Sequence, residues 1–189
     1  MTPEQLPLMQ FAVNSLAQVY PDIVLSDYLH GDVLANNDAL LQCAGTALET
    51  RNQLAESIVA DDVAPSSPES AQVLADRLTQ WSLPLAPGGP GNTTGSGVGA
   101  SPMLVVQGDE DNLVRWTWTL DAVRRACERG DVIDWRLRPG EGHGDLDTVA
   151  AFAWMADRFA AEPVADSCTS LVGPSGAEAL PEATSMDST

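Results

Sequence analysis

The chain of 189 residues is 44% hydrophobic, which is enough for one domain of ordinary size with a buried core. Its nine positive charges are all arginines and are outnumbered by 27 Asp and Glu, for a net charge of −18. This charge repels phosphate backbones and anionic membrane surfaces, so we expect no nucleic-acid partner. No apolar run approaches the roughly 18 to 20 residues of a membrane helix, and Met1 is not followed by a secretory signal. We therefore expect no transmembrane segment and, for the chain as written, a cytoplasmic location.

Residues 1–80 have the pattern of a bundle of short helices. The first apolar stripe steps by three or four residues and ends at Tyr20-Pro21, and apolar residues continue at helical spacing from Ala39 to Ile58. One more helix is predicted over residues 71–80. We expect this segment to resemble a lid more than a sheet.

Residues 81–101 are rich in Gly and Pro and have no apolar periodicity, which predicts a flexible linker. At the other end of the chain, residues 164–189 are dominated by small and polar residues, which predicts a disordered tail.

The segment between them, residues 102–163, reads as strand, helix, strand, helix. Met103 to Gln107 is a short apolar run of the buried parallel type, and the second strand is predicted over Val132 to Leu137, before Pro139-Gly140. The helix between these strands carries an apolar stripe at Trp116, Leu120, Val123 and Cys127, and Gly130 ends it. A last helix is predicted over about residues 147–161, with an inward stripe at Val149, Phe152, Met155 and Phe159. This order predicts an α/β fold with two adjacent parallel strands and flanking helices.

Two polar residues follow the two predicted strands. Asp111 lies in the turn after the first strand, within Gly108-x-x-Asp111, and His143 lies in the glycine-rich loop after the second. Because the carboxyl ends of parallel strands meet at one edge, we expect the two side chains to lie close together. The carboxylate could then fix the tautomer of the imidazole and stabilise its protonated form. Asp109 and Glu110 are weaker candidates for the acid.

The residues from Ala100 to Val114, from Thr119 to Gly130, and from Pro139 to His143 together resemble the C-terminal portion of the secretory lipases, as does Asp157-Arg158-Phe159-Ala160 before Cys168. These lipases are α/β-hydrolases that cleave triacylglycerols and related esters. The resemblance implies a partial α/β-hydrolase fold, with Asp111 as triad acid and His143 as triad base. It also implies an N-terminal helical lid, no cofactor, a lipid or ester substrate and secretion.

The sequence departs from that family in one respect. A Gly-x-Ser-x-Gly elbow, which holds the nucleophile and helps to form the oxyanion hole, is absent from the sequence. Ser96 and Ser175 lack the correctly spaced second glycine and are interpreted as loop residues. We therefore expect the C-terminal part of a secreted lipase or esterase, inactive alone, from an N-terminally shortened reading frame. The alternative is a non-catalytic module that binds a lipid or another protein.

The three cysteines add a further expectation. The last helix returns alongside the helix that holds Cys127, which brings Cys168 near it and predicts a disulfide, typical of an oxidising compartment. Cys43 is left over.

Other patterns are weaker. Gly95-x-Gly97-x-x-Ala100 formally fits a dinucleotide fingerprint, but no strand precedes it. The acidic residues around His143 lack metal-ligand spacing, so no metal is expected. His30 has no acidic partner at a suitable spacing and is interpreted as structural or solvent-facing.

Overall fold

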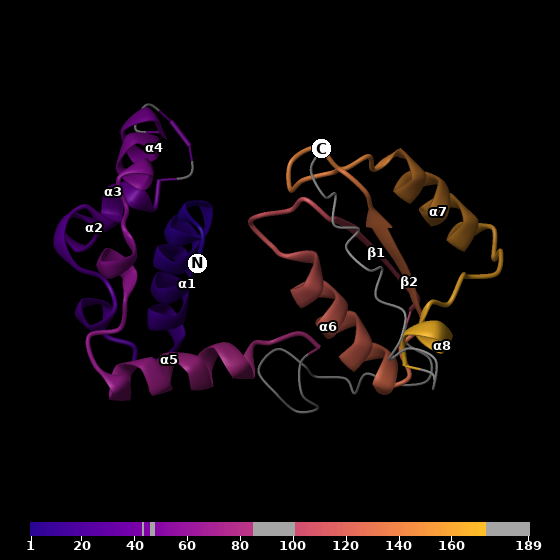
Figure 1. Cartoon of the computed structure of the whole chain (residues 1–189), viewed down its shortest axis with the longest axis horizontal. Coiled ribbons are helices and arrows are strands. Elements are labelled where there is room, and N and C mark those ends of the chain that lie inside the picture. The colour runs from indigo at the N-terminus through magenta and orange to yellow at the C-terminus, as the bar shows by residue number, and fades with distance from the viewer. Residues whose placement is uncertain (43, 46–47, 85–100, 173–189) are drawn as a thin grey trace, which may run out of the picture. The chain divides into compact units, whose positions relative to one another are not determined.

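The computed structural model describes residues 1–42, 44–45, 48–84 and 101–172. The chain divides into two compact units, Met1–Ser82 and Leu83–Thr189, and each is described by itself. The described elements are mostly helical, with a two-stranded parallel sheet, which confirms the mixed α/β class (Figure 1). The predicted linker over 81–101 lies almost entirely outside the described residues, as does the predicted tail beyond Val172.

The first unit is a bundle of short helices around one apolar core. Its α-helices are α1 (Leu6–Val19), α2 (Gly31–Ala35), α3 (Asn37–Leu40), α4 (Leu48–Glu56) and α5 (Pro68–Gln80). The described residues of this unit also form the 3-10 turns η1 (Pro3–Gln5), η2 (Leu25–Asp27) and η3 (Ala60–Val63). The core includes Val13, Tyr28, Leu29, Val33, Leu40, Val63 and Leu74.

Helix α1 begins and ends where the sequence predicts, but the run expected from Ala39 to Ile58 is broken. Helix α3 ends at Leu40 and α4 begins only at Leu48. Gly45 between them has a φ of 93°, in the left-handed region that interrupts a right-handed helix and suits glycine. Cys43, in the same interval, lies outside the described residues.

Buried amides join α1 to α3 inside this unit. The Asn37 Oδ1 accepts hydrogen bonds from Gln10 Nε2 at 2.6 Å and from Asn14 Nδ2 at 2.8 Å, while Asn37 Nδ2 donates to Asn14 Oδ1 at 2.8 Å. Because the amides satisfy one another, these polar groups are buried without leaving donors or acceptors stranded at this junction.

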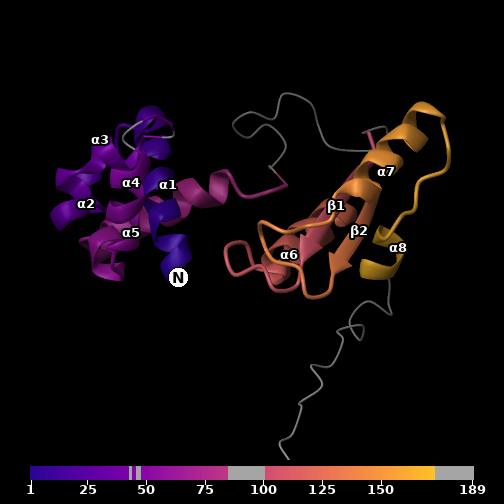
Figure 2. The same ribbon diagram turned by 90° about the horizontal axis from the view of Figure 1, so that it is seen from above.

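The second unit is built on the two predicted strands. Strand β1 (Met103–Gly108) pairs in parallel with β2 (Ile133–Arg138), in a register that sets Met103 beside Ile133 and Gly108 beside Arg138. Helix α6 (Trp116–Glu128) connects them, and Figures 1 and 2 show it alongside the strands. After β2 come α7 (Val149–Phe159) and the short α8 (Cys168–Leu171).

The core of this unit lies between α6, α8 and one face of the sheet. Leu120, Val123 and Cys127 are buried as the stripe on α6 predicts, and Ile133 of β2 is packed against that helix. Gly130 ends α6 in the left-handed region, with a φ of 87°.

The predicted boundary of the tail at residue 164 is wrong for its first part. Ser167 hydrogen-bonds β2 twice: its N–H donates to the Ile133 carbonyl at 2.8 Å, and its Oγ accepts from the Trp135 N–H at 3.0 Å. Cys168 is buried and bonded to Cys127. Residues up to 172 therefore belong to the folded unit. Ser167 supplies hydrogen-bond partners for backbone groups at the edge of β2 that β1 does not pair.

The predicted inward stripe of the last helix is also wrong. Among its four residues, Phe152 is 66% exposed and Phe159 is 94% exposed, and Val149 and Met155 are exposed as well. The partly buried residues of α7 are instead Ala151, Trp154 and Arg158. Helical spacing identified an apolar face correctly, but two strands provide too little apolar surface to cover it.

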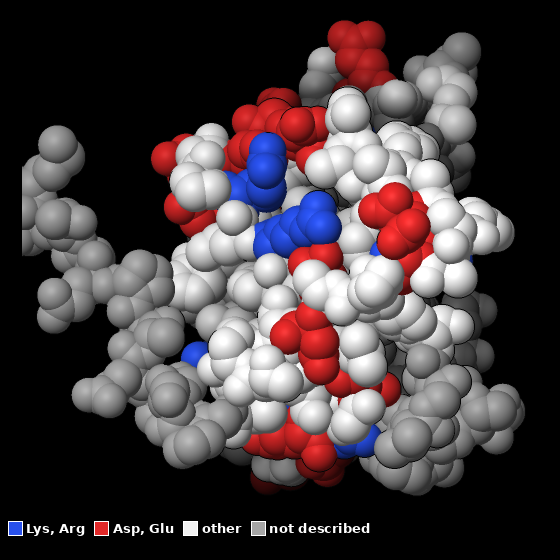
Figure 3. Space-filling view, turned by 90° about the vertical axis from the view of Figure 1, so that its right-hand side faces the viewer, with Lys and Arg blue, Asp and Glu red and all other residues white. Residues whose placement is uncertain are grey.

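Charge and hydropathy add two observations. On the face that Figure 3 shows, arginines and acidic side chains are interleaved. Within the described part of the chain, no helix has the length and apolar character needed to cross a membrane.

Candidate active site

Asp111 is held in the turn that follows β1. Its side chain is only 3% exposed, and its Oδ1 accepts hydrogen bonds from the backbone N–H groups of Leu113 at 2.9 Å and Val114 at 2.8 Å. An aspartate that binds the N–H groups two and three residues ahead closes a tight local turn. Its other oxygen, Oδ2, is thereby directed toward the loop that follows β2.

His143 meets that oxygen. Its Nδ1 lies 3.0 Å from Asp111 Oδ2, a hydrogen-bonding distance, although 32 residues separate the two in the chain. The carboxylate can only accept, so Nδ1 carries the hydrogen and Nε2 of the neutral ring is the basic nitrogen. The His143 side chain is 56% exposed, so its ring is open to solvent while its acidic partner is buried.

The electrostatics of Asp111 favour its charged form. Burial raises the pKa of the Asp111 carboxyl, but hydrogen bonds from the Val114 N–H, His143, Gln107 and the Leu113 N–H together outweigh it, so the pKa lies below its ordinary value. A buried carboxylate beside an exposed imidazole can stabilise a positive charge on that ring.

Gly108, the last residue of β1, lets the histidine loop approach. A Cβ at this position would lie 2.0 Å from the Glu141 carbonyl oxygen and 2.6 Å from its carbon. That carbonyl also accepts a hydrogen bond from the Glu110 N–H at 3.1 Å. The loop therefore rests directly on the backbone of β1, which only glycine permits.

Side chains around the loop fix its path. Asp109 Oδ1 accepts from the Gly140 N–H at 2.7 Å, and Asp145 Oδ1 accepts from the Gly142 N–H at 2.6 Å. Arg138 Nε donates to Glu141 Oε1 at 3.1 Å. Asp109 thus has a structural part in placing His143, distinct from the acid role that Asp111 can fill.

Two residues that sequence reasoning missed are Gln107 and Gly108. Gln107 is buried and its Nε2 donates to Asp111 Oδ2 at 2.9 Å. The sequence did hold a signal, because an amide inside an apolar strand must find polar partners. The close approach at Gly108 had no signal beyond the glycine itself.

The remaining candidates are placed as follows. Cys127 and Cys168 form a disulfide with an S–S distance of 2.02 Å. His30 Nε2 hydrogen-bonds the Ala64 carbonyl at 2.8 Å, a contact within the first unit that fits its structural interpretation. Ser96 and Ser175 lie outside the described residues, as does the Gly95-x-Gly97 pattern.

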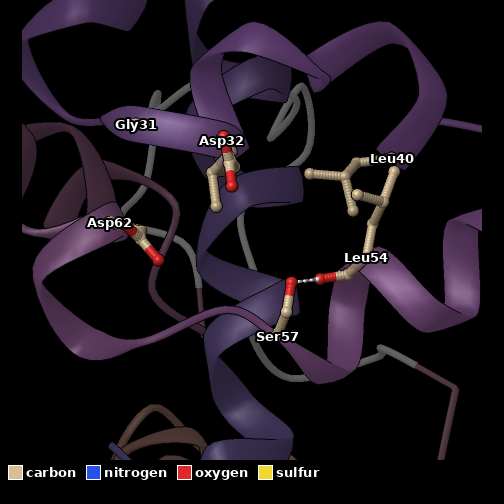
Figure 4. A pocket seen from close by; sticks show the side chains of 7 residues that line it. Gly31, Asp32, Leu40, Leu54, Ser57 and Asp62 are labelled. Atoms are coloured by element: carbon tan, nitrogen blue, oxygen red, sulfur yellow. Dashed lines mark hydrogen bonds between the residues drawn. The ribbon is translucent and has the colours of Figure 1, made fainter.

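Within the described residues, no group of three or more His, Cys, Asp or Glu is arranged to hold a metal ion. A cavity of about 340 Å³ in the first unit is lined by Asp32, Ser57 and Asp62 with apolar neighbours (Figure 4). Its polar groups bond locally: Ser57 Oγ donates to the Leu54 carbonyl at 2.7 Å, and Asp62 Oδ2 accepts from the Val59 N–H at 3.0 Å. The cavity contains none of the site residues that the sequence predicted.

Comparisons with known proteins give no assignment. No family model matches the chain, and neither a curated protein nor a solved structure matches it.

Proposed function

We propose that this chain is the part of a serine ester hydrolase that carries the acid and the base of the catalytic triad. The observation that carries the proposal is the 3.0 Å contact between His143 Nδ1 and Asp111 Oδ2 at the ends of two adjacent parallel strands. A buried carboxylate behind an exposed imidazole is the arrangement that a general base for a serine nucleophile needs.

The chemistry proposed for the pair uses Nε2 of His143 as the base and Asp111 as its partner. The oxygen of a serine attacks the ester carbonyl while Nε2 of His143 takes the serine proton, and Asp111 stabilises the imidazolium. The imidazolium then gives its proton to the departing alcohol, which leaves an acyl-enzyme. Water, activated by the same ring, releases the acid and restores the serine. Neither a metal nor an organic cofactor enters these steps.

Because no Gly-x-Ser-x-Gly elbow occurs in these 189 residues, the proposal takes the serine and the oxyanion hole from another polypeptide segment. The apolar face of α7 supports this, because the described residues of its own unit leave Phe152 66% exposed and Phe159 94% exposed, and another polypeptide segment could pack there. By the resemblance to secretory lipases, the first unit corresponds to a lid, the substrate is a lipid or another carboxylic ester, and the protein is secreted. The Cys127–Cys168 disulfide fits an oxidising compartment.

The test begins with the DNA that precedes the Met1 codon. We expect it to encode, in frame, further strands and a Gly-x-Ser-x-Gly elbow. The protein from the joined frame should hydrolyse p-nitrophenyl butyrate and label with a fluorophosphonate at that serine. Asp111→Asn should lower kcat by about four orders of magnitude, as loss of the triad acid does elsewhere.

Glu110→Gln is the matched control, because Glu110 is the exposed carboxylate next to Asp111 and its removal should leave kcat unchanged. An unrelated gene upstream would contradict the proposal. Stoichiometric fluorophosphonate labelling of a serine within these 189 residues would contradict the claim that the nucleophile lies elsewhere.

A non-catalytic lipid-binding module is the second candidate, favoured by the same apolar face of α7. It predicts that the purified chain binds phosphatidylcholine vesicles and that replacing Phe152 and Phe159 by Gln abolishes the binding.

A further inference from the structure

Gln107 is a buried polar residue whose hydrogen bonds converge on Asp111. It lies on β1, one residue before Gly108, and is only 6% exposed. Its Nε2 donates to Asp111 Oδ2 at 2.9 Å and to the Val114 carbonyl at 3.0 Å, with a longer contact of 3.3 Å to the Gly108 carbonyl. All three acceptors lie in the segment that holds the acid.

The orientation of the amide is determined by its other end. Thr119 on α6 donates its hydroxyl to Gln107 Oε1 at 2.8 Å. A rotated amide would place Oε1 against the Asp111 carboxylate and the Val114 carbonyl, which are both acceptors, and would turn its NH2 toward Thr119. The hydroxyl of α6 and the acceptors of the turn therefore select the same orientation.

The contacts leave the carboxylate little freedom. Oδ1 accepts from two backbone N–H groups, and Oδ2 accepts from Gln107 and from the His143 ring. Val114 closes the arrangement, since its N–H donates to Asp111 and its carbonyl accepts from Gln107. Removing Gln107 would take away the only described donor from β1 that holds Oδ2 in place for His143.

We propose that Gln107 is a positioning residue, which acts through Asp111 to hold the His143 ring with its hydrogen on Nδ1 and its basic nitrogen, Nε2, toward the substrate. This inference deepens the proposed function and rests on it for its catalytic meaning. The Thr119 hydroxyl extends the chain of hydrogen bonds one residue further, from α6 to the acid.

The test measures the tautomer of His143 from the ¹⁵N spectrum of its ring at alkaline pH, where imidazole is neutral. The chain has two histidines, and a His30→Gln variant assigns the signals. In the wild type we expect the Nδ1–H form to predominate. Gln107→Met keeps the volume and removes the donor, and should lower the ratio of Nδ1–H to Nε2–H at least about twofold, the low end of coupling within one network.

A second readout on the same variant is the carboxyl ¹³C titration of Asp111. Because the Gln107 hydrogen bond helps to lower the pKa of Asp111, Gln107→Met should raise it toward its ordinary value. Gln10→Met is the matched control: it removes a buried glutamine from the first unit, where the amide bonds Asn37, and should move neither readout.

If Gln107→Met does not fold, Thr119→Val decides the question. It leaves Gln107 in place and removes only the hydroxyl that orients it, and should shift the tautomer ratio in the same direction. A wild-type tautomer ratio in a folded Gln107→Met, or in Thr119→Val where only that variant folds, overturns the inference.

These results are separable from the proposed function. If the joined-frame protein lacks esterase activity while Gln107→Met shifts the tautomer as expected, the hydrolase proposal fails and the positioning by Gln107 stands. If the tautomer is insensitive to Gln107 while the esterase requires Asp111, the inference fails and the hydrolase proposal stands.

Discussion

Replacing Gly108 by alanine should move the loop that holds His143 away from Asp111. The added Cβ would lie 2.0 Å from the Glu141 carbonyl oxygen and 3.0 Å from that of Gly142. Real Cβ contacts essentially never fall below 3.0 Å, so the histidine loop must withdraw by about 1 Å. The clash is with backbone atoms of the histidine loop, which cannot rotate away as a side chain can.

The size of that movement decides the outcome. The His143 Nδ1 to Asp111 Oδ2 distance of 3.0 Å would grow to about 4 Å, beyond hydrogen-bonding reach. The Glu110 N–H to Glu141 carbonyl bond of 3.1 Å would lengthen in the same way. The weakened hydrogen bonds and the strain of overpacking should together lower the free energy of unfolding of this unit by about 1–3 kcal/mol.

Two assays follow the change. Tryptophan fluorescence during urea unfolding reports mainly the second unit, because four of the five tryptophans lie at 116, 118, 135 and 154. The ¹⁵N spectrum of His143 reports the hydrogen bond itself and should show loss of the preferred Nδ1–H form.

Gly144→Ala is the matched control in the same loop. A Cβ at Gly144 meets nothing within 4 Å, so the substitution should change the free energy of unfolding by no more than about 1 kcal/mol and leave the His143 spectrum unchanged. The contrary result is a Gly108→Ala protein that is as stable as the wild type and keeps its His143 spectrum. That result would refute the claim that glycine is needed at position 108 because the Glu141 backbone lies so close.

Three further perturbations, two by substitution and one by reduction of the disulfide, test other parts of the structure. Asp111→Asn should cost about 1–3 kcal/mol at neutral pH, because an NH2 group then faces donors. Since the folded pKa of Asp111 is lowered, its charge stabilises the fold above the unfolded pKa of about 3.9, and the difference from the wild type should shrink as pH falls below it; a difference independent of pH between 3 and 7 would be inconsistent. Gln in place of Phe152 and Phe159 should change the free energy of unfolding by less than about 0.5 kcal/mol per site and improve solubility, because both side chains are exposed. A loss of about 3 kcal/mol or more in urea unfolding would instead mean that these side chains are buried. Reduction of Cys127–Cys168, which closes 41 residues, should lower the free energy of unfolding by about 4 kcal/mol, and an unchanged urea midpoint in dithiothreitol would count against a structural disulfide.

The strands, α6 and the position of Asp111 relative to His143 could be predicted because local rules determine them. An apolar run gives the first strand, a short segment closed by Pro139-Gly140 gives the second, and their parallel order places both following loops at one edge. Gly130 ends α6 by its positive φ. These features depend on residues close in sequence or on the general geometry of parallel strands.

The features that the sequence did not predict all depend on contacts between different elements of the fold. Spacing finds the apolar face of α7 but not whether anything covers it, so it places Phe152 and Phe159 in the core, where the structure does not. Composition predicts a tail from residue 164 but misses Ser167, which hydrogen-bonds the edge of β2. The role of Gln107 likewise depends on Thr119 and Asp111, which only the folded chain brings to it.

The most direct test of the acid and base pair is the ¹⁵N imidazole spectrum of His143 in the wild type and in Asp111→Asn at alkaline pH. The account predicts hydrogen on Nδ1 in the wild type and a shift toward Nε2–H in the variant. Identical spectra would mean that Asp111 does not hold the ring, and the assignment of the pair to ester hydrolysis would be contradicted.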